Sequence, residues 1–215
     1  VYQFYCGMYL GFMLIYGLFF LALGHLAFLR KTGWWRLFLG WRYALRWLLV
    51  LACGVVLLTP LMLPYLRVHA LIMQTESGIR TFADISESLP RPVSFFFSHS
   101  GAGSWRIFAG TGLDVTPSWW DQMLFVGGMP WLAIGMSLFM IWSKRVSKQQ
   151  RSILLALLLS LVLSWLFCLD IAGFSLYQWV FALPGFSALR SLCRIINVQV
   201  MFFVMLFVAA LLPFF

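Results

Sequence analysis

Two arginines, Arg190 and Arg194, stand one helical turn apart where the last apolar run of the chain begins. Side chains at positions i and i+4 lie on the same face of a helix, so both guanidinium groups would reach one ligand. Each planar guanidinium group can donate two parallel hydrogen bonds to the oxygens of one phosphate. The spacing therefore predicts a site for a lipid-linked phosphate or diphosphate. Contact with anionic lipid headgroups is the competing interpretation.

A second group of charges lies between positions 76 and 87. Glu76 and Arg80 are four residues apart, as are Arg80 and Asp84, and Glu87 follows. Such spacing is typical of a ladder of ion pairs on a solvated helix face. The functional alternative is a polar rim that faces a substrate carrying phosphate and sugar.

Motifs for other chemistries are absent from the sequence. There is no HExxH, no EF-hand loop and no close His/Cys/Asp cluster, so we expect no metal and no cofactor. Since His25 is the only imidazole placed in an apolar run, ligation of haem or chlorophyll stays open there. The cysteines form no CxxC pair, but Cys168 and Cys193 could share one side of a membrane, which leaves a disulfide open.

The composition defines the class of protein that must position these residues. The chain is 63% hydrophobic and 10% charged, whereas a soluble domain is about half apolar and about a quarter charged. A polytopic integral membrane protein is therefore predicted. The net charge of +9 is explained by topology and lipid headgroups, so no nucleic-acid partner is expected. The sequence starts and stops inside apolar segments, which favours an internal piece of a longer protein.

Five apolar runs are near the length of about 20 residues that a membrane-spanning helix needs. An all-α domain over 1–215 is predicted, with spans at about 1–29, 47–66, 123–142, 152–169 and 195–215. Pro60 and Pro64 lie in the last turns of the second span. Between the first two spans, Arg42 and Arg46 indicate a short interfacial helix.

The charged residues are segregated among the loops. All three lysines fall in loops 30–46 and 143–151, whereas all six acidic residues fall in loops 67–122 and 170–194. By the positive-inside rule, the lysine-bearing loops are cytoplasmic and the two acidic loops are external. Within the larger external loop, an apolar stripe predicts a surface helix over 67–89 that ends at Pro90 and Pro92.

Three stretches together resemble a known family. They are 78–86 (GIRTFADIS) with 89–95 (LPRPVSF), then 124–133 (LFVGGMPWLA), and finally 183–190 (LPGFSALR) with Arg194. In order and spacing they resemble the later transmembrane half of bacterial membrane glycosyltransferases of the GT-C type. That family often has a proline between the two final arginines, where this chain has Ser191, Leu192 and Cys193.

The resemblance implies an inner-membrane enzyme that moves a sugar from a polyprenyl-phosphate donor to an acceptor on the non-cytoplasmic face. It also implies lipid-phosphate contacts at Arg80, Arg190 and Arg194. The family's catalytic carboxylate lies in the first external loop, which precedes this chain, so no catalytic residue is assigned. The alternative is a non-catalytic subunit of a larger membrane complex, such as a photosynthetic or respiratory assembly, favoured by the 11 tryptophans and the missing catalytic set.

Overall fold

The fold is built from helices. The computed structural model describes residues 8–29, 41–72, 81–99, 101, 103–104, 119–143, 146–182, 186 and 192–212. Its main helices are α2 (Met8–Leu29), α4 (Trp41–Ile72), α6 (Gly128–Ser143), α7 (Lys148–Cys168) and α9 (Ile196–Leu211). Within the described ranges the β structure is limited to one isolated bridge between Ile171 and Phe174. The expected all-helical fold is confirmed for this part of the chain.

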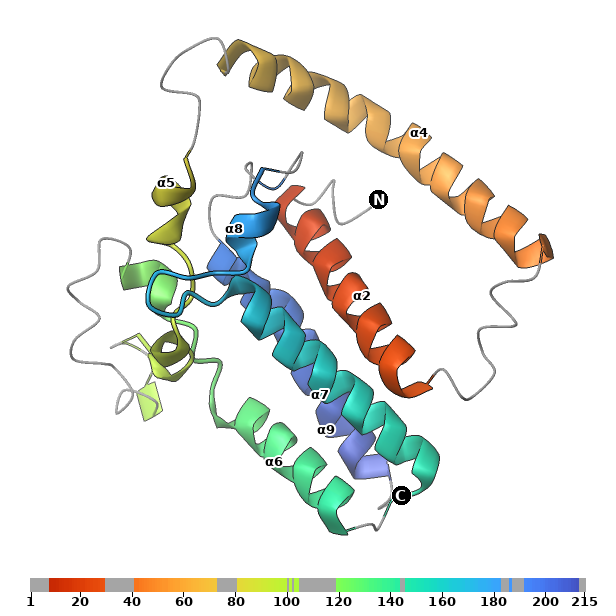
Figure 1. Ribbon diagram of the computed structural model, residues 1–215, viewed down its shortest axis with the longest axis vertical. Helices are drawn as coiled ribbons and strands as arrows, with labels where there is room; N and C mark the ends of the chain where they lie inside the picture. Colours follow the sequence, from red (N-terminus) through yellow and green to blue (C-terminus); the bar gives the residue numbers. More distant parts are fainter. Residues whose placement is uncertain are drawn as a thin grey trace.

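Helices α2, α6, α7 and α9 form a bundle (Figure 1). The most extensive contacts are between α2 and α7, between α6 and α9, and between α7 and α9. Among the described residues, three segments are long and apolar enough to cross a membrane, namely Gly11–Phe28, Lys148–Cys168 and Leu192–Leu211. Helix α6 has 16 residues and is about 24 Å long, somewhat less than a hydrocarbon core of about 30 Å. Three of the five predicted spans therefore have the required length and composition.

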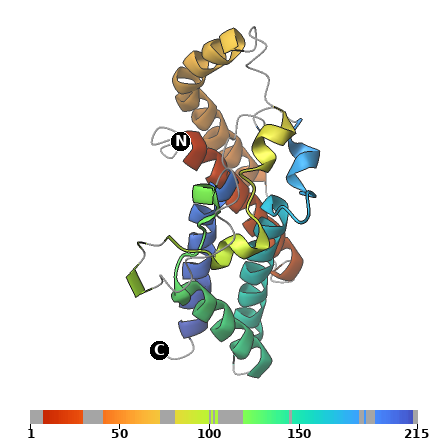
Figure 2. The same cartoon turned by 90° about the vertical axis from the view of Figure 1, so that its left-hand side faces the viewer.

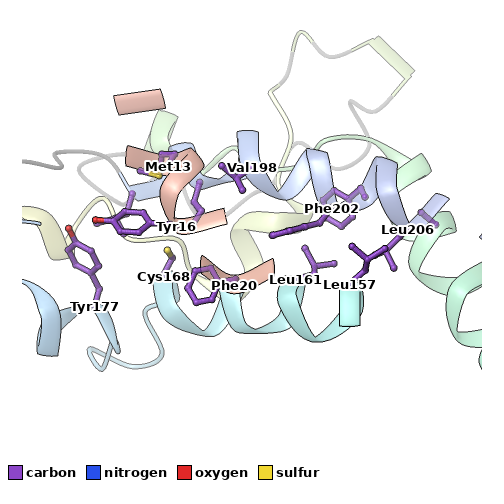
Figure 3. Close-up of a cluster of buried hydrophobic side chains, with 14 of the residues drawn as sticks. Met13, Tyr16, Phe20, Leu157, Leu161, Cys168, Tyr177, Val198, Phe202 and Leu206 are labelled. Carbon is purple, nitrogen blue, oxygen red and sulfur yellow. The ribbon is translucent and has the colours of Figure 1, made fainter. Parts of the chain in front are cut away.

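The core of the bundle lies between α2, α7 and α9 (Figure 3). Met13, Tyr16 and Phe20 of α2 are spaced three and four residues apart and are all buried. They face α7 and α9, which contribute buried side chains at similar spacing, including Leu157, Leu161, Val198, Phe202 and Leu206. Tyr177, just beyond the end of α7, closes this core with its ring against Phe167 at 5.7 Å between centroids.

Two glycines allow α2 to approach its neighbours closely. A Cβ at Gly24 would lie 2.3 Å from the Ala156 carbonyl oxygen, and one at Gly17 would lie 2.2 Å from a methyl carbon of Val198. Small residues at such crossings let helix backbones touch, which is a main source of stability for helices packed in lipid.

Helix α4 differs from the expected second span. It covers 32 residues and contains Pro60 and Pro64 in its interior, so these prolines do not end it. Arg42 and Arg46 belong to this same helix rather than to a separate interfacial helix. Each proline lacks the backbone N–H that would donate to the carbonyl four residues earlier. The Thr59 hydroxyl donates to the neighbouring Val55 carbonyl at 2.8 Å. Figure 1 shows α4 running beside the bundle rather than within it.

Short elements gather at the end of the bundle where α7 terminates and α9 begins (Figures 1 and 2). We call residues 81–99, 119–127 and 169–182 the loop layer. It contains α5 (Phe82–Ser86), η3 (Pro92–Phe96), η5 (Trp119–Gln122) and α8 (Tyr177–Val180), and η6 (Leu192–Ile195) directly precedes α9. Helices α5 and α8 lie side by side, with the rings of Phe82 and Phe181 5.8 Å apart.

The predicted surface helix over 67–89 is wrong as a single helix. Its first residues, through Ile72, belong to α4, and residues 73–80 lie outside the described ranges. The backbone at Thr81 is extended (φ −92°, ψ 162°), and a new, five-residue helix starts there. Asp84 explains this start, because its carboxylate accepts hydrogen bonds from the Thr81 N–H at 2.7 Å and from the Thr81 hydroxyl at 2.9 Å.

Candidate phosphate-binding surface

Gln122 is the centre of the loop layer. Its side chain is fully buried, and its Nε2 donates to the Leu89 carbonyl at 2.9 Å and to the Glu87 carbonyl at 3.4 Å. Its Oε1 accepts from the Ser94 hydroxyl and, at 3.4 Å, from the Arg91 N–H. One amide thus joins the end of the predicted loop 67–122 to a stretch about thirty residues earlier, which gives the layer a fixed shape.

Backbone hydrogen bonds extend this connection on both sides. The N–H of Leu124 donates to the Ser94 carbonyl, and the N–H of Phe125 donates to the Phe97 carbonyl, each at 3.1 Å. The N–H of Asp170 donates to the Pro90 carbonyl at 2.8 Å. Three stretches that are far apart in the sequence are therefore held together at one end of the bundle. The layer is a structured platform on which surface side chains have defined positions.

Two of the described carboxylates have structural roles. Asp84 caps α5, as described above. Asp170 accepts from the N–H of Gly173 at 2.9 Å, which closes the turn between Asp170 and Phe174. That turn needs left-handed backbone conformations, and it has them at Ala172 (φ 55°) and Gly173 (φ 86°). Both carboxylates therefore organise backbone in the layer.

Of the three arginines predicted to contact lipid phosphate, Arg194 is described and Arg80 and Arg190 lie outside the described residues. Arg194 is exposed in the last turn of η6, directly before α9. The thiol of its neighbour Cys193 donates to Asp121 Oδ1 at 3.5 Å. This contact holds η6 against η5, so Arg194 and Asp121 lie at the same edge of the loop layer.

Among the described residues, the acidic side chains lie near one end of α7, and Lys148 lies at the other end. Lys148 and Arg151 lie in its first turns, and Asp170 follows its last residue by two positions. A helix of 21 residues is about 31 Å long, close to the thickness of a hydrocarbon core. Arg91, Arg194 and the acidic residues Asp84, Glu87 and Asp121 are all at or beside the loop layer, at the opposite end from Lys148.

Other candidate residues are dispersed. His25 is partly buried near the end of α2, and Cys168 and Cys193 are buried and are not joined by a disulfide. Among the described residues, no three His, Cys, Asp or Glu side chains gather into a group that could hold a metal ion. The described site is thus a polar platform with an exposed guanidinium at its edge.

The sequence reasoning missed the residues that build this platform. Gln122 and Ser94 are buried, and both fall in the predicted external loop 67–122. Ser94 lies in the stretch 89–95 that resembles the family, but neither residue was predicted to be a buried hydrogen-bonding group. The available signal was positional, because Gln122 is the last strongly polar residue before an apolar run. A buried amide at such a place needs partners, and backbone carbonyls of a neighbouring loop can supply them.

Comparisons with protein-family models, with curated proteins and with solved structures found no match for this chain.

Proposed function

We propose that this chain is part of a GT-C-type membrane glycosyltransferase and contributes the surface that binds the phosphate of a polyprenyl-phosphate-linked sugar. The observation that carries the proposal is the position of Arg194. It is exposed at the edge of a structured polar layer and at the start of a helix long enough to cross a membrane. The three stretches of sequence that resemble the family support it independently.

The shape of the ligand fits this position. A polyprenyl phosphate has a long apolar tail and a charged head, so its tail lies along membrane-spanning helices and its phosphate lies at their end. Arg194 would then donate to the phosphate oxygens, with Arg190 one turn earlier in the sequence as its partner. Positive charge beside the leaving phosphate would stabilise the negative charge that develops there during sugar transfer.

The carboxylates of the layer favour a supporting role for this chain. Asp84 and Asp170 accept backbone hydrogen bonds that define turns, and Asp121 accepts from a buried thiol. A general base must be free to approach the acceptor hydroxyl. The resemblance implies that the catalytic carboxylate precedes this chain, so in the proposed function the base is supplied by another part of the enzyme and this chain binds the lipid donor.

The test is direct binding of undecaprenyl phosphate and of a sugar-loaded polyprenyl phosphate to the purified protein in micelles. The double variant Arg190→Ala/Arg194→Ala should bind at least about tenfold more weakly, which corresponds to about 1.4 kcal/mol. Arg151→Ala, which removes an exposed arginine from the opposite end of α7, is the matched control and should bind normally. Equal binding by the double variant and the control would refute the proposed phosphate site.

A second function, that of a non-catalytic subunit in a larger membrane complex, is favoured by helix α4. Its middle part exposes apolar side chains on several faces, including Leu48, Val50, Val55 and Val56, each more than half exposed. A helix of this kind needs lipid or protein around it. Co-purification in fixed stoichiometry with cofactor-bearing subunits would favour this function, whereas isolation as a lone polypeptide that binds polyprenyl phosphate would favour the transferase.

A further inference from the structure

Two polar atoms inside the bundle have no hydrogen-bond partner among the described residues. Trp165 Nε1 and Gln199 Oε1 are buried without a hydrogen bond in the part of the chain that the structure describes. Trp165 belongs to α7 and Gln199 to α9, both within segments that are long and apolar enough to cross a membrane. Lipid tails offer no hydrogen bonds, so an unpaired donor and an unpaired acceptor here are both costly.

The orientation of the Gln199 amide follows from its neighbour. The Ser164 hydroxyl donates to the Leu161 carbonyl at 2.7 Å, so its only proton is committed. Ser164 can therefore only accept, and Gln199 Nε2 donates to it at 3.4 Å. This arrangement fixes the Gln199 carbonyl oxygen on the other side of the amide, where it has no partner among the described residues.

Both side chains lie at the contact between α7 and α9. Trp165 directly follows Ser164, the residue that Gln199 contacts. The Trp165 ring also lies against Phe203, with 6.2 Å between centroids, and Phe203 is one helical turn after Gln199. Ile196, one turn before Gln199, packs in the same apolar cluster as Trp165. Trp165 therefore lies beside Phe203, which is on α9 one turn after Gln199.

The chemistry of the pair specifies its ligand. An indole N–H requires an acceptor, and an amide carbonyl requires a donor. An anion would satisfy the first group and be repelled by the second, and a cation would do the reverse. A hydroxyl oxygen both accepts and donates. We propose that the contact between α7 and α9 binds one hydroxyl group, to which Trp165 Nε1 donates and which donates to Gln199 Oε1. This inference is independent of the proposed glycosyltransferase function.

Two sources share this chemistry, namely a water molecule and the hydroxyl of a lipid headgroup. The probe is the Trp165 indole proton, observed by NMR in protein labelled with ¹⁵N-tryptophan. Phosphocholine micelles contain no headgroup hydroxyl, so only water can bind in them. Phosphatidylglycerol, which carries two headgroup hydroxyls, is then titrated in. The Trp165 resonance is assigned by its loss in Trp165→Phe, which keeps an aromatic ring at the position.

We expect a cross-peak between the Trp165 indole proton and water in the first micelle. If the site takes a lipid hydroxyl, the cross-peak appears instead with glycerol protons after phosphatidylglycerol is added. In Gln199→Met the cross-peak should be lost and the indole proton should move upfield, whereas Gln178→Met, at an exposed position in α8, should change neither. A Trp165 indole proton with no cross-peak to water or to phosphatidylglycerol in the wild-type protein would overturn the inference. That measurement decides the question even if Gln199→Met does not fold.

Discussion

Gly24 of α2 lies directly against Ser160 of α7: a Cβ at position 24 would stand 2.3 Å from the Ser160 hydroxyl oxygen. The same Cβ would stand 2.3 Å from the Ala156 carbonyl oxygen, and backbone cannot move aside as a side chain can. The contact between α2 and α7 is thus one of backbone against backbone, and its closeness depends on the absence of a single methyl group.

Gly24→Ala should consequently destabilise the bundle although alanine favours helices in general. Overpacking a well-packed position costs about 1–3 kcal/mol, which exceeds the roughly 1 kcal/mol gained in helix propensity. Thermal unfolding in detergent, followed by circular dichroism, measures the effect. Gly135→Ala is the matched control, because a Cβ at Gly135 of α6 meets nothing within 4 Å in the described structure. Equal melting temperatures for the two variants would contradict the close approach.

Gln122→Leu should loosen the loop layer while leaving the bundle intact. The change removes partners from the Leu89 carbonyl and the Ser94 hydroxyl, and a buried group left unpaired costs about 1–3 kcal/mol. Hydrogen exchange of the amides between positions 88 and 97 should accelerate at least about tenfold, since tenfold corresponds to about 1.4 kcal/mol.

The control for this variant is Gln178→Leu, which replaces an exposed glutamine of the same layer. Its exchange rates should match those of the wild type. If Gln122→Leu instead accelerated exchange throughout α7 and α9, the amide would stabilise the whole fold, and its assignment to the layer would be incorrect.

Ser147→Ala should destabilise the start of α7. The Ser147 hydroxyl accepts from the Gln150 N–H and the Gln150 side chain accepts from the Ser147 N–H, each at 3.2 Å, so the pair forms a capping box. Loss of such a cap costs about 1 kcal/mol. Chemical unfolding in detergent measures the change, with Ser152→Ala as control. The Ser152 hydroxyl donates only to the Lys148 carbonyl one turn earlier, and its removal should be nearly neutral.

The orientation of the chain is tested by labelling single cysteines in intact cells, in a background without the four native cysteines. Gln178→Cys places a thiol at an exposed position in the loop layer, and Ser147→Cys places one at the opposite end of α7. Because of the charge segregation, we expect a membrane-impermeant maleimide to modify position 178 only. Modification of position 147 from outside would reverse the proposed topology.

The long helices were predictable because apolar runs of sufficient length leave the backbone few alternatives in lipid. The runs that contain α7 and α9 were recognised in this way, and both are long enough to span a membrane. The extent of α4 was not predictable by the rule that proline ends helices. That rule weighs the lost donor of Pro60 but omits the rest of the backbone, which in an apolar segment still needs its helical hydrogen bonds.

The site was less predictable than the helices. Arg194 was predicted as a phosphate contact from its type and spacing and from the family resemblance; the structure describes it as exposed before α9, and the contact stays a prediction. Gln122 could not be identified, because its partners are backbone carbonyls, which every residue has and which leave no trace in a sequence. Asp84 was interpreted as one member of an ion-pair ladder with Arg80, a residue outside the described ranges. In the structure Asp84 also caps α5. The sequence spacing alone suggested an ion pair with Arg80 and did not reveal this capping role.

The hydrogen bonds of Gln122 also constrain how the protein is made. Synthesis proceeds from the N-terminus, so the stretch between Glu87 and Ser94 leaves the ribosome well before residue 122 exists to bind it. The Pro90 carbonyl receives its hydrogen bond later still, once Asp170, which follows the last turn of α7, has been synthesised. A nascent chain halted between these points would carry an unfinished layer at the membrane surface. Such a chain should be recognised by proteases there, and maturation of the layer should coincide with the insertion of α7.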